Sequence, residues 1–436
     1  MSNIENSPTT ADAAALQARI DAANARLDAA ELCGDPIIDQ IVSLGDRIAY
    51  DAGQCTFFVE EIEARVANLE SGGLDPDPNP DPDPVPDPPD PPTDPDPDPD
   101  PDPDPTPDPG PTTGSFPPPP SGFDIFDWTT WDASAWAAPT LAYRNANGIV
   151  MPAENNVGLG AYASYPHDHT VYNIPGPAQD QAWGRSQRVL EYAADAGWQT
   201  INSRTFSTPN EVVRNKVIRN ATVTAPGVRF EQCAFITSGS RAVKIELGSG
   251  QYATFIDCDF GPFPGTVASG SNTGGQTLDT AIGFNRYVAI RCRFWGMKDG
   301  TKCSGDSAFL HCWVGNQVKS QGAHNDCLQA TGGRRIGIFG CGLWGPWQTG
   351  TSCIKLTAEK GDLEDAFIAG NRVAGGTYTI FLTEKNGDQL RDTDCMRNSF
   401  IRNSYKWGPF FKSNIGQVNT LGNLFDDNGA AVPDPF

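Results

Sequence analysis

The sequence predicts an all-β fold, a right-handed parallel β-helix over residues 213–436, preceded by a small α-helical module and a Pro/Asp linker. Three observations predict it: a repeated apolar pattern that ends in Cys or Asn, a repeat length of about 27 residues, and a second strand pattern inside each repeat. Repeats of this length form a solenoid, because each coil buries its apolar side chains against the next coil.

The repeat reads apolar-x-apolar-x-x-[Cys/Asn]-x-apolar, as in V-R-F-E-Q-C-A-F at 228–235 and A-T-F-I-D-C-D-F at 253–260. Alternation at a period of two is typical of β-strands. We expect the Cys and Asn side chains to stack as a ladder at the turn that ends the strand. The ladder positions, which run from 233 to 423 in seven intervals, are Cys233, Cys258, Cys292, Cys312, Cys341, Asn371, Asn398 and Asn423.

A second strand recurs between ladder positions when segments are matched by a shared terminal Gly, at 243–250, 326–333, 354–361 and 380–387. This matching predicts one inward-facing and one outward-facing column of side chains. The inward column is Ile245, Leu328, Leu356 and Leu382, and the outward column is Glu246, Gln329, Thr357 and Thr383.

The pattern resembles the pectate-lyase-like superfamily of right-handed parallel β-helices, over about half of the chain. Leucine-rich repeats are the main alternative, since their period and their Asn position are similar. Two features oppose them. The apolar positions are Phe, Ile, Val and Ala more than Leu, and the second half of each coil carries a strand where a leucine-rich repeat has a helix.

The remaining chain divides into three parts. Residues 1–73 show apolar positions at helical spacing and predict an anchoring or oligomerising module, with a small helical domain without a partner as the alternative. Residues 74–120 form a linker of mainly Asp and Pro, which favours an extended, stiff chain. Residues 121–212 are a Trp-rich capping region, in which we expect a helix over 181–196 to cover the open N-terminal end of the solenoid.

The charge of the chain is concentrated before the β-helix. The net charge is -23, but residues 1–73 and 74–111 each carry thirteen acidic residues, with four Arg in the first segment and no basic residue in the second. The rest of the chain has 28 acidic and 27 basic residues. Because nucleic-acid binding requires a basic surface, we expect no nucleic-acid partner.

The N-terminus has no basic or apolar region of a signal peptide, and no stretch is apolar and long enough to cross a bilayer. We therefore expect neither Sec export nor membrane insertion. The eleven Cys are odd in number and fall largely at repeat positions, which predicts reduced core thiols. These features favour synthesis in a bacterial cytoplasm and a place on the surface of a virion or phage-like particle; secretion without a Sec signal is the alternative.

The order of a helical head, a stiff spacer and a β-helix resembles a spike or tail fibre of a phage or phage-like particle. The resemblance implies a homotrimer that docks on a particle or capsid protein through its N-terminal module and binds cell-surface capsular polysaccharide. Since a β-helix does not determine its chemistry, a polysaccharide lyase or glycoside hydrolase that acts on an acidic polysaccharide is the alternative.

The segment A-H-N-D-C-L-Q at 323–329 holds the strongest site candidates. Gly matching puts Asp326 in the column of Val243, Ile354 and Ile380, where a carboxylate would cost several kcal/mol unless it is paired or turned outward. We therefore expect a bend that turns His324, Asp326 and Gln329 towards one surface. His324 and Asp326 are the candidate catalytic acid and base, and a hydrogen-bonded kink is the alternative.

Neighbouring coils add further candidates for substrate binding. A lyase needs a base and a cation, and a hydrolase needs two carboxyl groups. Trp residues beside a turn suit sugar stacking, although such rings also shield the edges of a solenoid. The candidates are Gln329, Lys298, Asp299, Asp306, Lys355, Trp344 and Trp347. We expect no metal site and no cofactor; Ca²⁺ is conceivable for this fold, without support from the spacing of acidic residues.

Overall fold

The computed structural model describes residues 115–161, 178–271, 274–318, 324–346, 350–413 and 418–433. The helical module at 1–73 and most of the linker lie outside the described residues, so their predicted structures stay predictions. Trp347 also lies outside them.

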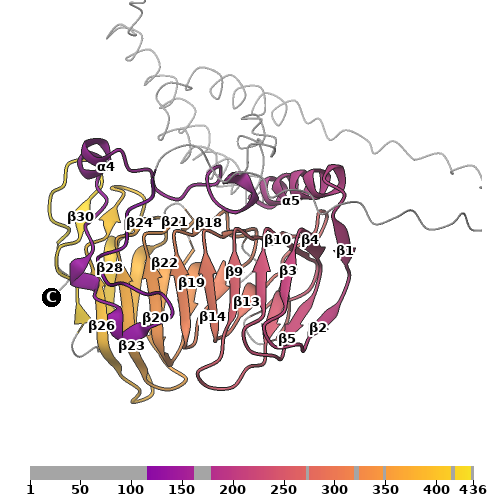
Figure 1. Ribbon diagram of the computed structural model, residues 1–436. Coiled ribbons are helices and arrows are strands. Elements are labelled where there is room, and N and C mark those ends of the chain that lie inside the picture. Colours follow the sequence, from indigo (N-terminus) through magenta and orange to yellow (C-terminus); the bar gives the residue numbers. More distant parts are fainter. Residues whose placement is uncertain are drawn as a thin grey trace, which may run out of the picture. The chain divides into compact units, whose positions relative to one another are not determined.

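From Gln199 onward the chain winds in coils of three strands, and each strand pairs in parallel with its equivalents in the neighbouring coils (Figure 1). The equivalent strands form three faces, which we call sheets A, B and C. Sheet A has ten strands: β1 (Gln199–Ile201), β4 (Lys216–Ile218), β7 (Ala234–Thr237), β10 (Asp259–Pro262), β15 (Arg293–Trp295), β18 (Trp313–Gly315), β21 (Gly342–Trp344), β24 (Arg372–Ala374), β27 (Ser399–Phe400) and β30 (Leu424–Phe425).

Sheet B has nine strands: β3 (Val212–Arg214), β6 (Arg229–Glu231), β9 (Ala253–Ile256), β14 (Tyr287–Ile290), β17 (Ser307–Leu310), β20 (Gly333–Phe339), β23 (Leu363–Ala369), β26 (Leu390–Met396) and β29 (Val418–Asn419). Sheet C is split into two parts that meet at a single bridge between Thr280 and Asp299. Part C1 comprises β2 (Arg204–Phe206), β5 (Ala221–Val223), β8 (Arg241–Ile245) and β13 (Thr280–Gly283). Part C2 comprises β16 (Thr301–Lys302), β19 (Asp326–Ala330), β22 (Ser352–Ala358), β25 (Tyr378–Glu384) and β28 (Gly408–Ser413).

This architecture is the predicted all-β, right-handed parallel β-helix. Its first coil begins at Gln199, earlier than the start at 213 that the repeat predicts. The interval of 34 residues between Cys258 and Cys292 contains an inserted antiparallel hairpin of β11 (Ser269–Ser271) and β12 (Gly274–Thr277). The short interval between Cys292 and Cys312 reflects the two-residue strand β16.

The predicted Cys/Asn ladder is confirmed at the corner between sheets B and A. From Cys312 onward, each ladder residue accepts the backbone N–H of the equivalent residue one coil earlier, as in Cys312 N to Cys341 Sγ at 3.3 Å and Cys341 N to Asn371 Oδ1 at 2.8 Å. The residue before each ladder position has a φ between 51° and 71°, Asp257 and Gly422 among them. A residue in the left-handed conformation turns the chain sharply. Each ladder residue therefore directly follows the turn that forms the corner.

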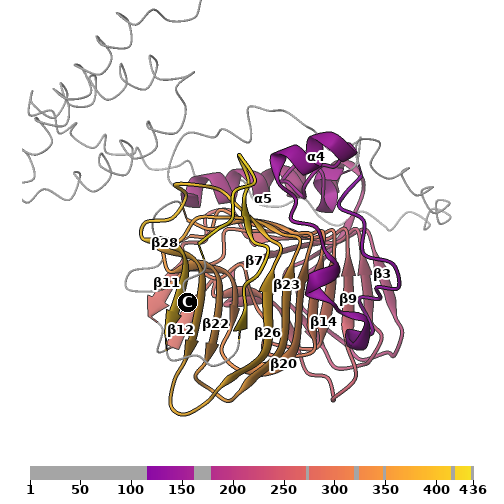
Figure 2. The same cartoon turned by 90° about the vertical axis from the view of Figure 1, so that its left-hand side faces the viewer.

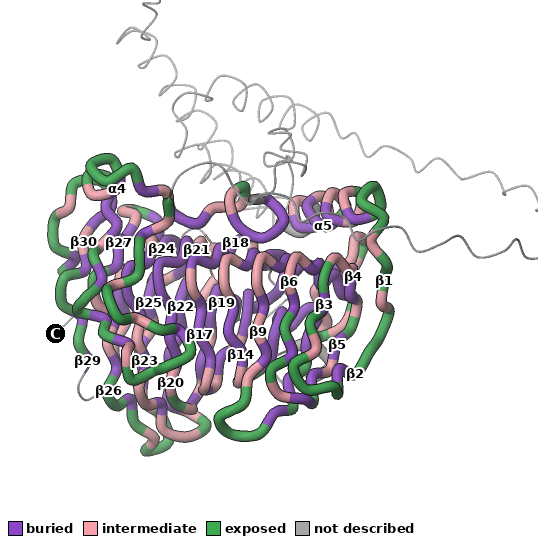
Figure 3. The backbone as a smooth tube through the Cα atoms, viewed as in Figure 1, coloured by how far each residue is buried: buried purple, intermediate pink, exposed green. Residues whose placement is uncertain are grey.

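The interior is a stack of apolar side chains. Figure 3 shows the backbone of the buried residues in purple along the strands. Phe235, Phe260 and Phe294 lie parallel on successive coils, with 4.7 Å between ring centroids at each step. All nine Cys among the described residues are buried and free, as the sequence predicts. Burial raises the pKa of thiols in this stack, such as Cys258 and Cys292, which keeps them protonated.

The segment before the β-helix lies along its outside. It contains η1 (Trp128–Thr130), η2 (Ala133–Ala135), α4 (Leu141–Asn147) and η3 (Gly158–Ala161). Trp131 and Trp136 contact Phe339 on the outer side of sheet B, with ring centroids 5.3 and 5.4 Å apart. Figure 2 shows the indigo chain beside these strands, with α4 close to the C-terminal coil. There Arg144 Nη1 donates to Asp426 Oδ1 at 2.5 Å.

Helix α5 (Ala178–Asp195) forms where the sequence predicts a helix, but it does not lie across the end of the solenoid. Its apolar residues Ala182, Val189 and Ala193 pack on the outer side of sheet A. The helix lies against β4, β7 and β10 (Figure 1). Trp295 Nε1 donates to Ala182 O at 3.1 Å. The helix lies there because outward-facing Val217, Ala234 and Ile236 give sheet A an apolar outer side.

The pre-solenoid segment therefore covers two of the three faces. Among the described residues, its apolar side chains pack on sheets A and B. Sheet C2 is the face on which the sequence-predicted site residues of β19 and β22 lie. No helix in the described part of the chain is long and apolar enough to span a membrane.

Candidate functional site

Sheet C2 presents one residue from each of its five strands in a row across the sheet. Lys355 lies between Ile354 and Leu356, which are fully buried in the core, so its side chain belongs to the outer side. In the register of sheet C2, Lys355 and its equivalents on the other four strands lie directly beside one another. At about 4.8 Å between strands the row spans roughly 19 Å. This outer row is Lys302, Gln329, Lys355, Phe381 and Phe411.

The register of β19 against β22 differs by two residues from the alignment that the shared terminal Gly predicted. Asp326 pairs with Ser352, which in turn pairs with Tyr378; the shared Gly had predicted a column with Ile354 and Ile380. The Gly is an unreliable marker because two residues join β19 to β20, whereas four join β22 to β23. The predicted inward residues are all buried, but Leu328 pairs with Ile354 and not with Leu356.

Asp326 lies on the same side of the sheet as the outer row. Gln329 Nε2 donates to Asp326 Oδ2 at 3.3 Å, and Ser352 Oγ donates to Asp326 Oδ1 at 2.6 Å. The next residue, Cys327, is buried in the core. Leu328 is buried in the core as well, so the alternation of side chains is interrupted between Cys327 and Leu328, and Asp326 and Gln329 come to lie on one side.

A cluster of acidic and basic side chains lies beside Asp326, where sheet C is split. Lys298 and Lys302 each place Nζ 2.7 Å from an oxygen of Asp279 and 3.4 Å from Asp299 Oδ2. Asp299 Oδ1 also accepts the backbone N–H of Asp326 at 3.2 Å. We call these five residues, Asp279, Lys298, Asp299, Lys302 and Asp326, the Asp–Lys cluster.

The carboxyl groups of the cluster differ in their acidity. Burial raises the pKa of Asp299, against the opposing effect of Lys302 and Lys298. Burial disfavours ionisation of Asp279 as well, but Lys302 and Lys298 outweigh it and lower its pKa. The pKa of Asp326 rises to about 7, because the group is buried and lies near the Asp299 carboxylate, while Lys355 and Ser352 oppose the shift. Asp299 and Asp326 are thus the two carboxyl groups of the cluster whose protonated form is favoured by burial.

Three other predicted site residues belong neither to the outer row nor to the Asp–Lys cluster. His324 is exposed, with Nδ1 2.6 Å from Thr351 Oγ1. Asp306 follows β16 closely in sequence, but it lies beyond the corner into sheet B and accepts a hydrogen bond from Arg335 Nε at 2.6 Å. Trp344 is on sheet A, 5.1 Å from the Arg372 guanidinium. Asp306 and Trp344 thus do not join the outer row.

The sequence analysis missed a group of aromatic side chains at the C-terminal end of sheet C2. Phe381 and Phe411 stack with 4.3 Å between centroids, Tyr378 lies 5.1 Å from Phe411, and Trp407 lies 5.6 Å from Tyr378. Trp407 is 66% exposed. The stretch Y-K-W-G-P-F-F at 405–411 is rich in aromatic residues. Only the pairing of β25 with β28 shows that Phe411 continues the outer row beside Phe381. Tyr378, Phe381, Trp407 and Phe411 are the aromatic group.

The geometry suits binding better than acid–base cleavage. A catalytic acid must touch the bond it protonates, yet Asp299 and Asp326 have no exposed surface. In the aromatic group, by contrast, Trp407 is exposed and the other three rings are partly exposed. The outer row continues from these rings to Lys355 and Gln329. The arrangement can stack an apolar ring face at one end and can donate hydrogen bonds and positive charge further along.

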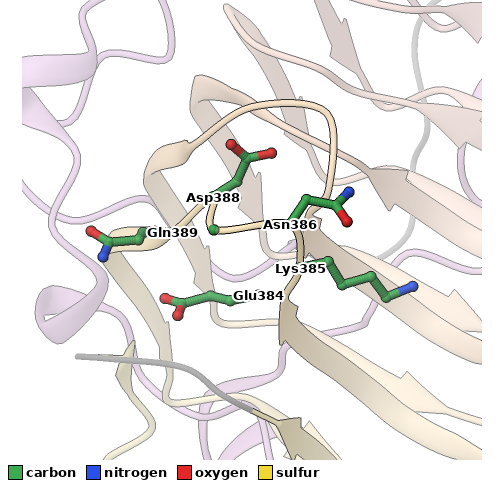
Figure 4. A pocket seen from close by; sticks show the side chains of 6 residues that line it. Glu384, Lys385, Asn386, Asp388 and Gln389 are labelled. Carbon is green, nitrogen blue, oxygen red and sulfur yellow. The ribbon is translucent and has the colours of Figure 1, made fainter.

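A shallow depression of about 290 Å³ lies elsewhere, in the turn between β25 and β26 (Figure 4). Its side chains serve the turn itself. Asp388 Oδ2 accepts the N–H of Gly361 at 2.8 Å, and Glu384 Oε1 accepts the N–H of Leu390 at 2.9 Å. In Figure 4 the labelled side chains point away from one another, so they form no converging site.

In the part of the chain that the structure describes, no group of three or more His, Cys, Asp or Glu side chains is placed to hold a metal ion. No family model matches this chain. No curated protein matches it either. Among solved structures, QnrB1, a plasmid-mediated fluoroquinolone resistance protein, is 11% identical over 50% of this chain and 89% of its own, with a TM-score of 0.19. At that TM-score the match carries no argument about function.

The raised pKa of Asp326 predicts a pH-dependent stability. The folded protein prefers the protonated carboxyl, whereas an unfolded Asp has a pKa of about 3.9. The stabilisation is therefore complete below about pH 4 and is lost as the pH rises through about 7. We expect Asp326→Asn to remove this decline, on the order of 3 kcal/mol between pH 4 and pH 8, in urea unfolding measured across that range.

The control for this prediction is Asp427→Asn, which removes an Asp that is paired with Arg402 at the surface. This variant should keep the pH profile of the wild type. Equal slopes for the wild type and Asp326→Asn would show that Asp326 does not titrate in this window.

Proposed function

We propose that this protein is a spike or fibre of a virion or phage-like particle that binds cell-surface polysaccharide through sheet C2. In this proposal the module at 1–73 docks on a particle protein and joins three chains into a homotrimer. The Asp/Pro linker separates this module from the β-helix. The fold of the β-helix is of the pectate-lyase-like type. The order of the modules along the sequence supports the first part.

The exposed Trp407 is the observation that carries the binding proposal. An indole that is 66% exposed leaves a large apolar surface in water. Its neighbours Tyr378, Phe381 and Phe411 hold a continuous chain of ring contacts. Aromatic rings bind at low cost in conformational entropy and present flat apolar faces, which suit the CH faces of sugar rings.

Cleavage of the bound polysaccharide is the second candidate function. The raised pKa of Asp326, next to Asp299 and between lysines, is the observation that favours it, since acid–base catalysts titrate near the working pH. The complete burial of both carboxyl groups favours binding instead.

The test is to incubate the full-length protein with a panel of bacterial capsular and uronate polysaccharides, and to measure binding by pull-down and cleavage by reducing ends and unsaturated sugars. We expect Trp407→Ala to weaken binding of the bound polysaccharide at least roughly tenfold, as for aromatic hot spots worth about 1.4 kcal/mol or more. New reducing ends that Asp326→Asn abolishes would establish cleavage.

Trp128→Ala is the matched control, because Trp128 is also exposed but lies on the segment outside sheet B. It should bind like the wild type. Loss of binding in Trp128→Ala with retention in Trp407→Ala would move the site away from sheet C2. A wild-type protein that binds nothing in the panel would contradict the proposed function.

A further inference from the structure

Lys355 is a buried cation at the centre of sheet C2. It is only 8% exposed, and the neighbours on either side of it in β22 belong to the core. Its position in the outer row lies between Gln329 on one strand and Phe381 on the other. The ammonium group therefore lies between the Asp–Lys cluster and the aromatic group.

The charge of Lys355 is not matched by an ion pair. Lys298 and Lys302 each have two carboxylates within 3.4 Å. Among the described residues, no ion pair and no hydrogen bond of the Lys355 ammonium is found. A buried charge is costly unless it is paired. Lys355 is thus the lysine of the outer row that has no carboxylate partner among the described residues.

Asp326 is the carboxyl group whose ionisation Lys355 promotes. It does not neutralise Lys355, because its oxygens are bonded to Ser352 and Gln329 and it shares its surroundings with Asp299. Burial and the nearby Asp299 carboxylate also raise the pKa of Asp326 to about 7, which favours its protonated, uncharged form. An anion from outside the chain would complete the pairing of Lys355.

We propose that Lys355 contacts an acid group of the bound glycan, so that the ligand of sheet C2 is an acidic polysaccharide that bears carboxylates. The acidic sugar lies over β22, and the adjoining sugar lies on the rings of Phe381 and Phe411, one and two strands further along the row. This inference rests on the proposed function, and it names the substrate class of the same site.

The experiment compares each polysaccharide that binds the full-length protein with its carboxyl-reduced form, starting with polygalacturonate, alginate and hyaluronate. Carboxyl reduction keeps the sugar backbone and removes the negative charge. We expect it to weaken binding at least tenfold. Lys355→Met should weaken binding of the acidic form to a similar extent, and it should have no further effect on the reduced form.

Lys385→Met is the matched control, because Lys385 is half exposed in the β25–β26 turn and pairs with Glu359. It removes the same charge and should not change binding. If Lys355→Met does not fold, the comparison of native and carboxyl-reduced polysaccharide with the wild type still decides the question. Equal binding of the two forms would overturn this inference and leave polysaccharide binding standing. A protein that binds no polysaccharide would overturn both.

Discussion

Replacing Arg293 by Met is expected to lower the free energy of unfolding by about 3 to 5 kcal/mol. Arg293 and Asp259 form a fully buried ion pair, with Nε 3.0 Å from Oδ1 and Nη2 2.5 Å from Oδ2. Methionine fills a similar volume but leaves the Asp259 carboxylate without its cation. Burial already raises the pKa of Asp259 against the effect of Arg293, so the variant is expected to protonate Asp259 or to lose structure around it.

The same change should loosen the segment that covers sheet A. Arg293 Nη1 donates to Glu154 O at 2.8 Å, and Asp259 Oδ1 accepts the N–H of Leu159 at 3.2 Å. These bonds join the segment to β10 and β15. We therefore expect faster proteolysis within 115–161 in Arg293→Met, together with a lower midpoint in denaturant unfolding followed by tryptophan fluorescence.

Arg291→Met is the control, since Arg291 pairs with Asp257 between the same two coils but at the surface, with 36% of its side chain exposed. Its loss should cost about 1 kcal/mol or less. Adding Asp259→Asn to Arg293→Met should recover part of the stability. Equal losses for the two single Arg variants would show that burial of the pair does not determine its contribution.

The fold was predictable because each corner between sheets B and A from Cys233 onward uses a Cys or Asn side chain, and this residue recurs in the sequence once per coil. Cys or Asn at the ladder positions, with alternating apolar residues around them, specifies both a strand and its end. The first coils lack this signal. At the corner before β4, Asn215 takes the left-handed conformation and Lys216 occupies the ladder position. The Cys/Asn repeat in the sequence therefore starts later in the chain than the first coil of the β-helix.

The candidate site was predictable only in part, because sheet C has no such marker. Its corners vary in length, and the shared Gly therefore misplaced Asp326 by two residues against β22. Asp306 was predicted to lie with Lys298 because the two are close in the sequence, but a corner of the coil separates them. Trp407 precedes a strand that carries no ladder residue, and its neighbours Tyr378 and Phe411 reach it only through the pairing of β25 with β28.

Asn398 tests the ladder itself. Its side chain is fully buried; Nδ2 donates to Ile368 O at 2.9 Å, and Oδ1 accepts the N–H of Asn371 at 3.1 Å. Asn398→Ala would leave both backbone groups without partners inside the protein, at about 1 to 3 kcal/mol for each unsatisfied group. We expect a loss of about 2 to 5 kcal/mol in denaturant unfolding.

Asn398→Cys should lose clearly less, because the upstream coils make the same bonds with sulfur. Cys312 Sγ accepts the N–H of Cys292 at 3.4 Å and donates to Ala289 O at 3.4 Å. Asn419→Ala, at an exposed position of β29, should change stability by about 0.5 kcal/mol or less. If the Cys variant were as unstable as the Ala variant, the ladder would depend on side-chain shape. A smaller loss would show that any side chain able to accept one N–H and donate to one carbonyl can continue the coil, which accounts for the change from Cys to Asn along the solenoid.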